Sequence, residues 1–441
     1  MTWLNRIDWA VTDTREAALA RPPRGRDPRV AAGVAEIFAD VEARSVEAVR
    51  EWSIRLDGAA PSEVLIDDAA VAGARAAVDL ADLEALRFAA RAIRGFHELD
   101  KPADGPAVET VPGAVSRRVW RPIASAGLYV PGGTAPLFST LLMLAIPAAV
   151  AGVSVRTVVT PPRDGGAHPM MLLAAAEAGV ERLHLVGGAQ AIAALAFGAG
   201  LPRADKIFGP GNAWVAEAKR RAADLPGGPA IDLPAGPSEL LVIADGEADA
   251  ALVAADLLSQ AEHDADAQVL LVTADAGLIA RVEAELERQL RALPRAEIAR
   301  ASLAASRAIL CRNGGEAVEI ADRYAPEHLS IQTRDAVDLA ARVSNAGTVF
   351  VGAWAAESFG DYVSGPSHVL PTDGAARVFA GVTTASFMKS FAVQTVTAPA
   401  VAALADAAAR LARLEGLEAH ALAADLRAER AGARGAARGA A

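Results

Sequence analysis

Seven histidines occur in the chain, and four of them stand in short stretches rich in acids and amides. Imidazole, carboxylate and amide groups are what acid–base catalysis and metal binding require. The other three, His97, His168 and His184, lie in stretches without further reactive residues, so we interpret them as structural or surface groups. The four candidate stretches are 260–264, 327–328, 357–368 and 415–420.

A metal site is the first chemistry that these stretches suggest. Gln260 and His263 are three residues apart, which on a helix places both on one face, one turn apart. The pair alone is more typical of a capped helix end. If Asp361 and His420 converge on it, two imidazoles, one carboxylate and one amide oxygen would suit zinc or a neighbouring divalent ion. Such a site would keep a net positive charge and could take a neutral nitrogen from a ligand.

Acid–base chemistry is the second possibility, and it rests on Glu327 and His328. They follow a proline and precede a predicted strand. Neighbours on a strand point to opposite faces, but at a strand end the backbone can bend so that both face a cleft. A histidine with an ordinary pKa near ~6.5 suits proton abstraction from an alcohol, and a nearby glutamate could activate water. The alternative interpretation is a helix cap beside a hydrogen-bonded structural histidine.

Glycine-proline turns at 209–212 and 235–239 lie beside predicted strand ends, where open α/β sheets bind ligands. The first turn opens a helix, so its backbone amides could meet a phosphate. The chain has no G-x-G-x-x-G, and such turns alone do not separate a nucleotide site from an ordinary tight turn. Tyr129, in YVPGG, could stack on a ring or simply pack. Cys311 lies within a predicted strand, and we favour a buried inert thiol, which argues against thiol-dependent aldehyde oxidation.

The elements that must position these residues follow from hydrophobic periodicity. Apolar residues at a spacing near 3.6 predict helices over 27–56 and 69–97. From about residue 117, short β-branched runs alternate with alanine-rich helices, and a second such series begins at 239. This alternation predicts an α/β fold with parallel sheets, helices on both faces, and two such domains, one inserted in the other. After about residue 376 the pattern is helical, and 429–441 is a low-complexity tail that we expect to be disordered.

Composition excludes several classes of protein. The 441 residues carry 43 basic and 54 acidic side chains, a net charge of −11, which argues against nucleic acid or an anionic membrane as a partner. One cysteine excludes an intramolecular disulfide framework and fits a reducing cytoplasm. The N-terminus lacks the basic and apolar regions of a signal peptide. The apolar stretch 137–155 contains Pro147 and polar residues, so we expect a buried helix leading into a strand rather than a membrane span.

Eight blocks, in order from about residue 30 to 427, together resemble the histidinol dehydrogenase family. They are GLYVPGGTAPLFSTLLMLAIPA, GGAQAIAALAFG, DKIFGPGNAWVAEAKR, IDLPAGPSELLVIAD, DLLSQAEHDADAQVLL, APEHLSI, ESFGDYVSGPSHVLPT and EGLEAHALAADLR. The resemblance implies a cytoplasmic homodimer with one Zn²⁺ per subunit. It also implies oxidation of L-histidinol to L-histidine through L-histidinaldehyde with two NAD, the last step of histidine biosynthesis.

The resemblance also implies a domain organisation, with two incomplete Rossmann-like parallel-sheet domains and small helical N- and C-terminal segments. The expected parts are an N-terminal arm (1–26), a first Rossmann-like domain carrying the zinc and catalytic residues (27–127 and 239–382), an inserted NAD-contacting domain (128–238), a C-terminal helical segment exchanged between subunits (383–428) and the tail (429–441).

Particular residues take on roles by the same resemblance. Glu327 and His328 match the catalytic pair, in which His328 takes the hydroxyl proton and Glu327 activates water for the second oxidation. The zinc ligands would be Gln260, His263, Asp361 and His420, the last from the partner subunit. The substrate-contacting positions would be these four ligands together with Ser238, His328, His368 and Glu415. The positions that contact NAD would be Tyr129, Gln190 and Asn212.

Three alternatives stay open on the sequence. A relative with the same machinery could oxidise a sulfonated diol, but that substrate needs a cationic group where histidinol needs an acid, and Glu415 favours the amine. A zinc-bound structural or ligand-binding protein without catalysis would not need Glu327 and His328. An NAD enzyme without metal would keep its activity after demetallation.

Overall fold

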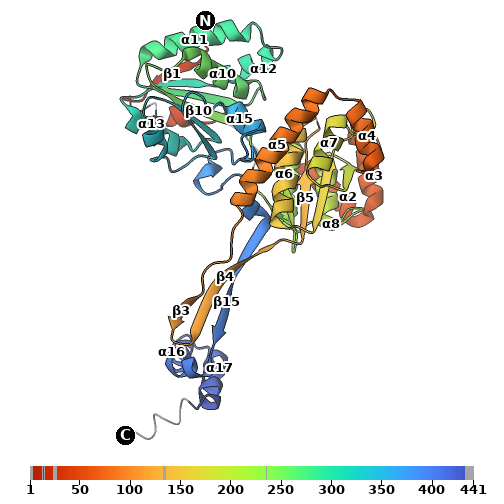
Figure 1. The fold of residues 1–441 in the computed structure, drawn as a ribbon, viewed down its shortest axis with the longest axis vertical. Helices are drawn as coiled ribbons and strands as arrows, with labels where there is room; N and C mark the ends of the chain where they lie inside the picture. Colours follow the sequence, from red (N-terminus) through yellow and green to blue (C-terminus); the bar gives the residue numbers. More distant parts are fainter. Residues whose placement is uncertain are drawn as a thin grey trace. The chain divides into compact units, whose positions relative to one another are not determined.

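The computed structural model of the chain describes residues 3–11, 13, 15–22, 27–132, 136–234 and 236–432. The chain forms two compact units (Figure 1). The larger unit comprises Met1–Lys101 and Ile123–Phe387, and the smaller unit comprises Pro102–Pro122 and Met388–Ala441. The larger unit holds two mainly parallel sheets, and the smaller unit holds an antiparallel sheet with a pair of helices.

The first sheet of the larger unit has six parallel strands in the order β1-β12-β11-β10-β13-β14. Its central strand β10 is buried throughout because alternate side chains enter separate cores on the two faces. Helices α10, α11 and α12 cover one face, and α1, α13 and α14 cover the other. The elements are β1 (Asn5–Asp8), α1 (Arg15–Leu19), β10 (Glu239–Ala244), α10 (Ala250–Ala261), β11 (Gln268–Thr273), α11 (Ala276–Leu290), α12 (Ala296–Ala304), β12 (Arg307–Leu310), α13 (Gly314–Tyr324), β13 (His328–Gln332), α14 (Ala336–Ala340), β14 (Thr348–Val351) and α15 (Glu357–Tyr362).

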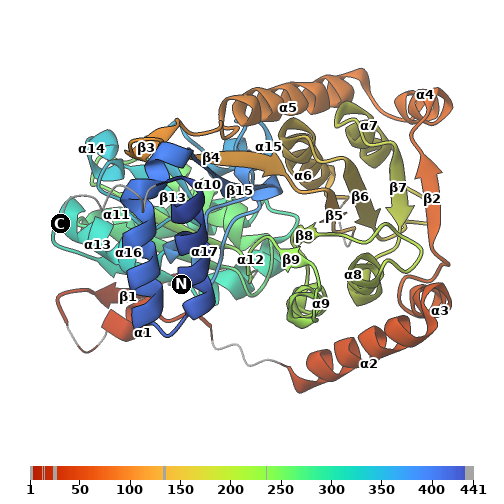
Figure 2. The same ribbon diagram turned by 90° about the horizontal axis from the view of Figure 1, so that it is seen from below.

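The second sheet has the order β2-β7-β6-β5-β8-β9, with only the edge strand β2 antiparallel to its neighbour. Helices α2, α3, α8 and α9 cover one face, and α4, α5, α6 and α7 lie on the other (Figure 2). The elements are α2 (Pro28–Arg44), α3 (Val46–Leu56), β2 (Ser62–Leu65), α4 (Asp68–Ala76), α5 (Leu80–Leu99), β5 (Ser125–Tyr129), α6 (Phe138–Ala151), β6 (Val155–Thr160), α7 (Pro169–Glu177), β7 (Arg182–Leu185), α8 (Gly188–Phe197), β8 (Lys206–Phe208), α9 (Ala213–Asp224) and β9 (Ala230–Ile231).

The two sheets repeat one strand order. Numbered along the chain, β10, β11, β12, β13 and β14 are arranged 3-2-1-4-5, and β5 to β9 are arranged in the same way. This is the order of a dinucleotide-binding sheet that lacks its last strand. In both sheets the order reverses between the first and fourth strands, which defines a crevice beside β5 and β8 and another beside β10 and β13. The predicted α/β class with two incomplete Rossmann-like sheets is therefore confirmed.

The smaller unit is built on a long antiparallel pairing. Strand β15 (Met388–Val396) pairs with β4 (Ala114–Pro122) from Met388↔Pro122 to Val396↔Ala114, and β3 (Val108–Val111) adds to the other edge of β4. Helices α16 (Val401–Leu414) and α17 (Glu418–Arg430) pack against each other at the end of the chain. In the described part of the chain, short 3-10 helices include η2 (Ala375–Arg377) and η3 (Thr384–Phe387) in the larger unit, and η4 (Ala398–Ala400) in the smaller.

The apolar stretch at 137–155 forms α6, as expected of a buried helix that leads into a strand. Most of its side chains are buried, and Gly152 ends it with a φ of 92°. Among the described residues, no helix combines the length and the hydropathy that a bilayer span requires.

The division of the chain differs from the expected boundaries. We expected 27–127 to join 239–382, but α2 and α3 share a core with α8 and α9, and β2 pairs with β7 in the second sheet. Residues 102–122 belong to the smaller unit. The reason is that a helix with one apolar face can cover either of two similar sheets, and the sequence does not say which.

Two local expectations also needed correction. The expected helix 27–56 breaks at Ser45, which has a φ of 54°, so α2 and α3 are separate helices. The pattern after residue 376 was expected to be helical throughout, yet 388–396 form β15. Most side chains of β15 are exposed, so no clear alternation marks the strand, and its partner β4 supplies the pairing. Residues 429–430, expected in a disordered tail, end α17, and 433–441 lie outside the described residues.

Candidate functional site

The predicted catalytic pair lies where β10 and β13 run side by side. The register pairs Leu240 with His328, so Glu327 and His328 face the residue that opens β10, Glu239. The backbone N–H of Glu239 donates to Glu327 Oε2 over 2.8 Å, and its carbonyl oxygen is 3.3 Å from His328 Nδ1. Both side chains are buried. The pair thus sits at the amino ends of these strands, whereas open α/β sheets usually bind ligands at the carboxyl ends.

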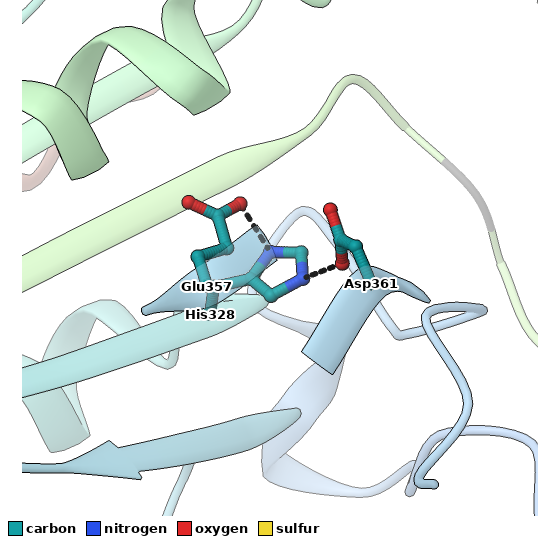
Figure 3. A group of neighbouring side chains, drawn as sticks. All are labelled: His328, Glu357 and Asp361. Atoms are coloured by element: carbon teal, nitrogen blue, oxygen red, sulfur yellow. Dashed lines mark ion pairs between the residues drawn. The ribbon is translucent and has the colours of Figure 1, made fainter. Parts of the chain in front are cut away.

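Helix α15 adds two carboxylates to this pair. Glu357 and Asp361 are four residues apart, which places both on one helix face, and both point at His328 (Figure 3). Nδ1 of His328 is 3.6 Å from Glu357 Oε1, and Nε2 is 3.5 Å from Asp361 Oδ1. A glycine allows the close approach of α15, because a Cβ on Gly360 would stand 2.5 Å from the Phe350 ring.

Buried charge of one sign dominates the electrostatics here. Burial by itself lowers the pKa of His328, but Glu327, Glu357 and Asp361 raise it well above the ordinary value. Burial raises the pKa of Glu357. Burial also works to raise the pKa of Asp361, yet the nearby imidazole of His328 brings it below its usual range. Three carboxylates around one imidazole make a centre that suits a cation or a transferable proton.

A metal ion has two overlapping sets of side chains available. His328, Glu357 and Asp361 offer ligand atoms that all lie within 4.8 Å of one another. The expected set shares only Asp361 with this group and adds Gln260, His263 and the partner's His420. Gln260 lies in the last turn of α10, and the N–H of His263 donates to the Gln260 carbonyl over 3.2 Å, which continues the helical spacing past the end of the helix.

Gln260 is the residue whose surroundings most favour contact with a bound cation. Its side chain is buried, and neither amide atom has a hydrogen-bond partner in the described part of the chain. Leaving a buried amide unsatisfied costs about 1–3 kcal/mol, which an ion held by Oε1 would relieve. The charge of His263 acts on Asp361, so both belong to one electrostatic neighbourhood. The amide, imidazole and carboxylate of Gln260, His263 and Asp361 are ligand types that zinc accepts.

His368 lies on the other side of Asp361. Its Nδ1 is 2.9 Å from the Asp361 carbonyl and must donate there, so Nε2 accepts from the Thr140 hydroxyl over 2.9 Å. Burial lowers the pKa of His368, in keeping with a neutral ring. A hollow opens between these groups. It is lined by His328, Thr348, Phe350, Gly360, Asp361, Pro366, Ser367, His368 and Leu370.

Three further predicted residues stand outside this group. Ser238 is half-buried directly before Glu239, and its carbonyl accepts from the Gln268 N–H over 3.1 Å. Glu415 follows α16, and His420 lies in the first turn of α17, so both belong to the smaller unit, where they are exposed. The larger unit therefore contains three of the four expected metal ligands.

The expected NAD residues gather at the carboxyl edge of the second sheet. Tyr129 ends β5, and Asn212 opens α9 just after β8, so the two flank the crevice where the strand order reverses. The Tyr129 hydroxyl accepts from the Gly188 N–H over 3.2 Å, and burial raises the pKa of Tyr129 to about 12. Gln190 is buried in the first turn of α8. Asn212 is exposed and caps α9 by accepting from Trp214 N–H at 3.1 Å.

Asp57 is a residue of this edge that the sequence did not reveal. Its Oδ2 accepts from the Gly187 N–H at 2.9 Å and from Gln190 Nε2 at 3.0 Å, so a carboxylate of the protein occupies the start of α8. Burial raises the pKa of Asp57. No local pattern marks it, because it lies 130 residues before Gly187. The N-terminus of α8 is therefore already bonded to a carboxylate of the protein and is not open to an anion.

The structure agrees with the interpretation of Cys311 as an inert thiol and of three histidines as structural or surface groups. Cys311 follows β12, is buried, and has a pKa raised by burial to about 11, which makes the thiol unreactive at neutral pH. His168 caps α7, with Nδ1 accepting from the Met170 N–H over 3.2 Å. His97 is buried in α5, and His184 is half-buried in β7.

Fold and site together define an α/β protein with two Rossmann-like sheets. One sheet carries a nucleotide-type crevice at its carboxyl edge, and the other carries a buried histidine-carboxylate centre that suits metal and acid–base chemistry.

Comparison with known proteins narrows this class to one family. The chain matches the family model for histidinol dehydrogenase over residues 21–428. It is 48% identical to histidinol dehydrogenase of Xanthomonas oryzae pv. oryzae over 425 residues, 96% of this chain and 98% of the relative. It is 44% identical to that of Salmonella typhimurium over 97% of this chain and 98% of the relative. The crystal structure of histidinol dehydrogenase from Elizabethkingia anophelis superposes with a TM-score of 0.93, at 37% identity, over 98% of this chain and 99% of the other. The chain belongs to the histidinol dehydrogenase family.

Proposed function

We propose that the protein oxidises L-histidinol to L-histidine through L-histidinaldehyde with two NAD, as the last step of histidine biosynthesis. The observation that carries the proposal is the buried Glu327–His328 pair, with Asp361 3.5 Å from His328, in a chain of the histidinol dehydrogenase family. Two neighbouring bases, one for the hydroxyl proton and one that activates water, are what two successive oxidations of an alcohol require.

His328 is the base of the first oxidation. Nδ1 faces the Glu239 carbonyl and two carboxylates, so it holds the ring proton. Nε2 makes no hydrogen bond with any described residue, although it lies 3.5 Å from Asp361 Oδ1. In the neutral ring Nε2 carries no proton, so it would accept the hydroxyl proton of the substrate while the hydride departs from the carbinol carbon.

Glu327 serves the second oxidation. The Glu239 N–H holds one of its oxygens, which orients the carboxylate. Glu327 takes a proton from water as the water oxygen bonds to the aldehyde carbon, and His328 returns the proton of the first oxidation to the aldehyde oxygen, giving a gem-diol. His328 then accepts a proton from the diol as the second hydride leaves, and the product is the carboxylic acid. No thiol takes part, in agreement with the buried Cys311.

Zinc and NAD complete the proposed centre. Gln260, His263 and Asp361 of one chain and His420 of the partner subunit would hold one Zn²⁺ per subunit. When bound, zinc supplies a template for the imidazole and amino nitrogens of histidinol. His368, Ser238 and the partner's Glu415 would contact the substrate, with Glu415 as counter-charge to its amine. NAD, which accepts the hydrides, would contact Tyr129, Gln190 and Asn212.

A homodimer in the cytoplasm is part of the proposal. Exposed leucines on α16 and α17 support it, since clustered apolar side chains on a surface mark an interface. They are Leu411, Leu414, Leu417, Leu422 and Leu426. If active sites are shared, inactive His328→Ala and His420→Ala variants should partly restore activity when mixed and refolded. No recovery would mean that each site is built from one chain.

The reaction is tested by counting NADH. Purified protein receives limiting L-histidinol and excess NAD, before and after treatment with a chelator. A ratio of two NADH per histidinol, lost on chelation and restored by zinc, supports both oxidations and the metal. A ratio of one would remove the second oxidation from the proposal, and no NADH would overturn it. Full activity in demetallated protein would overturn the zinc assignment alone.

A further inference from the structure

Arg21 lies in the N-terminal segment, outside every motif that pointed to the site. Its guanidinium nevertheless reaches Glu239, 218 residues further along the chain. Nε donates to Glu239 Oε1, and Nη2 donates to Oε2 over 2.9 Å. The Glu239 side chain is only 2% exposed and that of Arg21 is 18% exposed. A two-bond contact between a guanidinium and a carboxylate, largely shielded from solvent, fixes the relative position of the two side chains as well as pairing their charges.

The same guanidinium holds a second segment of the chain. Nη2 donates to the Tyr324 carbonyl over 2.9 Å, and the guanidinium carbon lies 4.0 Å from the centroid of the Tyr324 ring. Tyr324 ends α13, and Ala325 has a φ of 54°, a left-handed conformation that an alanine adopts only when its surroundings hold it. The Tyr324 hydroxyl donates to Gln268 over 2.8 Å. The turn is thus anchored two residues before Glu327.

Both segments border the catalytic pair: the turn precedes it in the chain, and Glu239 contacts it. The N–H of Glu239 donates to Glu327, and the carbonyl of Glu239 faces His328 Nδ1. One small movement of the Glu239 backbone would therefore disturb both residues together. The Asp373 N–H also donates to Glu239 Oε1, over 3.1 Å, but Arg21 is the side chain that joins Glu239 to the turn before Glu327.

We propose that Arg21 is a positioning residue. It joins Glu239 to the turn at 324–325 and so holds the side chains of Glu327 and His328 in the positions that the reaction requires. This inference rests on the proposed function, in which those two residues move protons. Substrate contacts are assigned to other side chains. Loss of Arg21 should therefore lower kcat and leave KM for histidinol almost unchanged, since misplacement of catalytic groups by about 1 Å costs about 100-fold in rate.

The test compares Arg21→Gln with Arg15→Gln as a matched control. Arg15 lies in the same N-terminal segment, donates to the Trp9 carbonyl over 2.8 Å and lies 5.2 Å from the centroid of the Trp9 ring, but it has no bond to Glu239. We expect Arg21→Gln to lose about 10- to 100-fold in kcat, with KM and bound zinc within about 3-fold of wild type. Arg15→Gln should stay within about 3-fold in all three quantities.

Two further variants show whether the ion pair acts as a unit. Arg21→Lys keeps the charge but loses the fork, so its kcat should fall between those of wild type and Arg21→Gln. In a double-mutant cycle, Glu239→Gln combined with Arg21→Gln should lose no more kcat than Arg21→Gln alone, because the second change removes a contact that is already broken.

Several results would overturn the inference: a kcat for Arg21→Gln equal to that of Arg15→Gln, a loss confined to KM or to zinc content, or additive losses in the double variant. If Arg21→Gln does not fold, the test uses Arg21→Lys instead. A wild-type kcat in Arg21→Lys would then overturn the inference. An active wild type with an unchanged kcat in Arg21→Gln defeats this inference alone. An inactive wild type defeats the proposed function first.

Discussion

A buried ion pair behind the expected NAD site links packing to cofactor binding. Lys219 of α9 bonds Asp232, and the two side chains are only 4% and 1% exposed. Lys219 Nζ also donates to the Gly209 carbonyl over 2.8 Å, and Asp232 Oδ2 accepts from the Gly209 N–H over 2.7 Å. The pair thus holds both backbone groups of the residue that opens the turn 209–212, where Asn212 lies.

Lys219→Met should destabilise the protein by about 3–5 kcal/mol, because it leaves the buried charge of Asp232 without a partner. We expect the lower half of this range, since Asp232 keeps the N–H bonds from Gly209 and from Leu233, the latter over 2.8 Å. Asp232→Asn in the same chain removes that charge and should recover part of the loss. The loosened turn should raise KM for NAD more than KM for histidinol.

The assay is urea denaturation followed by tryptophan fluorescence, with KM for both substrates measured on the folded variants. Lys206→Met is the matched control, because Lys206 is half-buried and donates to the Ser386 carbonyl over 3.1 Å without a bonded carboxylate. It should lose about 1 kcal/mol. The reasoning fails if Lys219→Met costs no more than this control, or if adding Asp232→Asn makes the protein still less stable.

Three other outcomes are expected. Burial lowers the pKa of His97 to about 4, from 6.5, so between pH 7 and pH 5 the unfolded chain takes up a proton there and the folded chain does not. The wild type should therefore lose about 2 kcal/mol more than His97→Gln over this interval, measured by urea midpoints, and parallel curves would contradict the burial argument. Gly209→Ala should destabilise by roughly 2–4 kcal/mol more than Gly227→Ala. Both glycines have positive φ, but a Cβ on Gly209 would stand 2.0 Å from the Tyr129 carbonyl oxygen, whereas one on Gly227 meets nothing within 4 Å. Equal losses would show that the contact relaxes. His263→Asn should lose most of its zinc on dialysis, by metal analysis, and full retention would remove His263 from the ligand set.

Local sequence patterns determined the class of fold and the chemistry of the candidate site. The alternation of β-branched runs with alanine-rich helices is visible within windows of about ten residues, because side-chain periodicity is a property of each element by itself. Glu327 and His328 also stand out locally, between a proline and a strand. The same holds for Gln260 and His263, which one helical turn separates.

Tertiary structure decided the features that depend on distant partners. Strand β15 has no strong alternation of its own and exists because β4 pairs with it along its length. Helices α2 and α3 have apolar faces that either sheet could have covered. Their contacts with α8 and α9 place them on the second sheet. Pairing and packing between remote segments leave no trace in a local window.

The site shows the same contrast most clearly. The sequence by itself pointed to the catalytic pair and to Asp361, since their residue types and neighbours suggest the chemistry. It did not point to Arg21, whose contact with Glu239 spans 218 residues of the chain. Nor did it point to Asp57, which accepts a hydrogen bond from Gly187, 130 residues further along the chain. Reactive groups are recognisable from their own chemistry, but the groups that hold them in place become visible only when the folded chain brings them together.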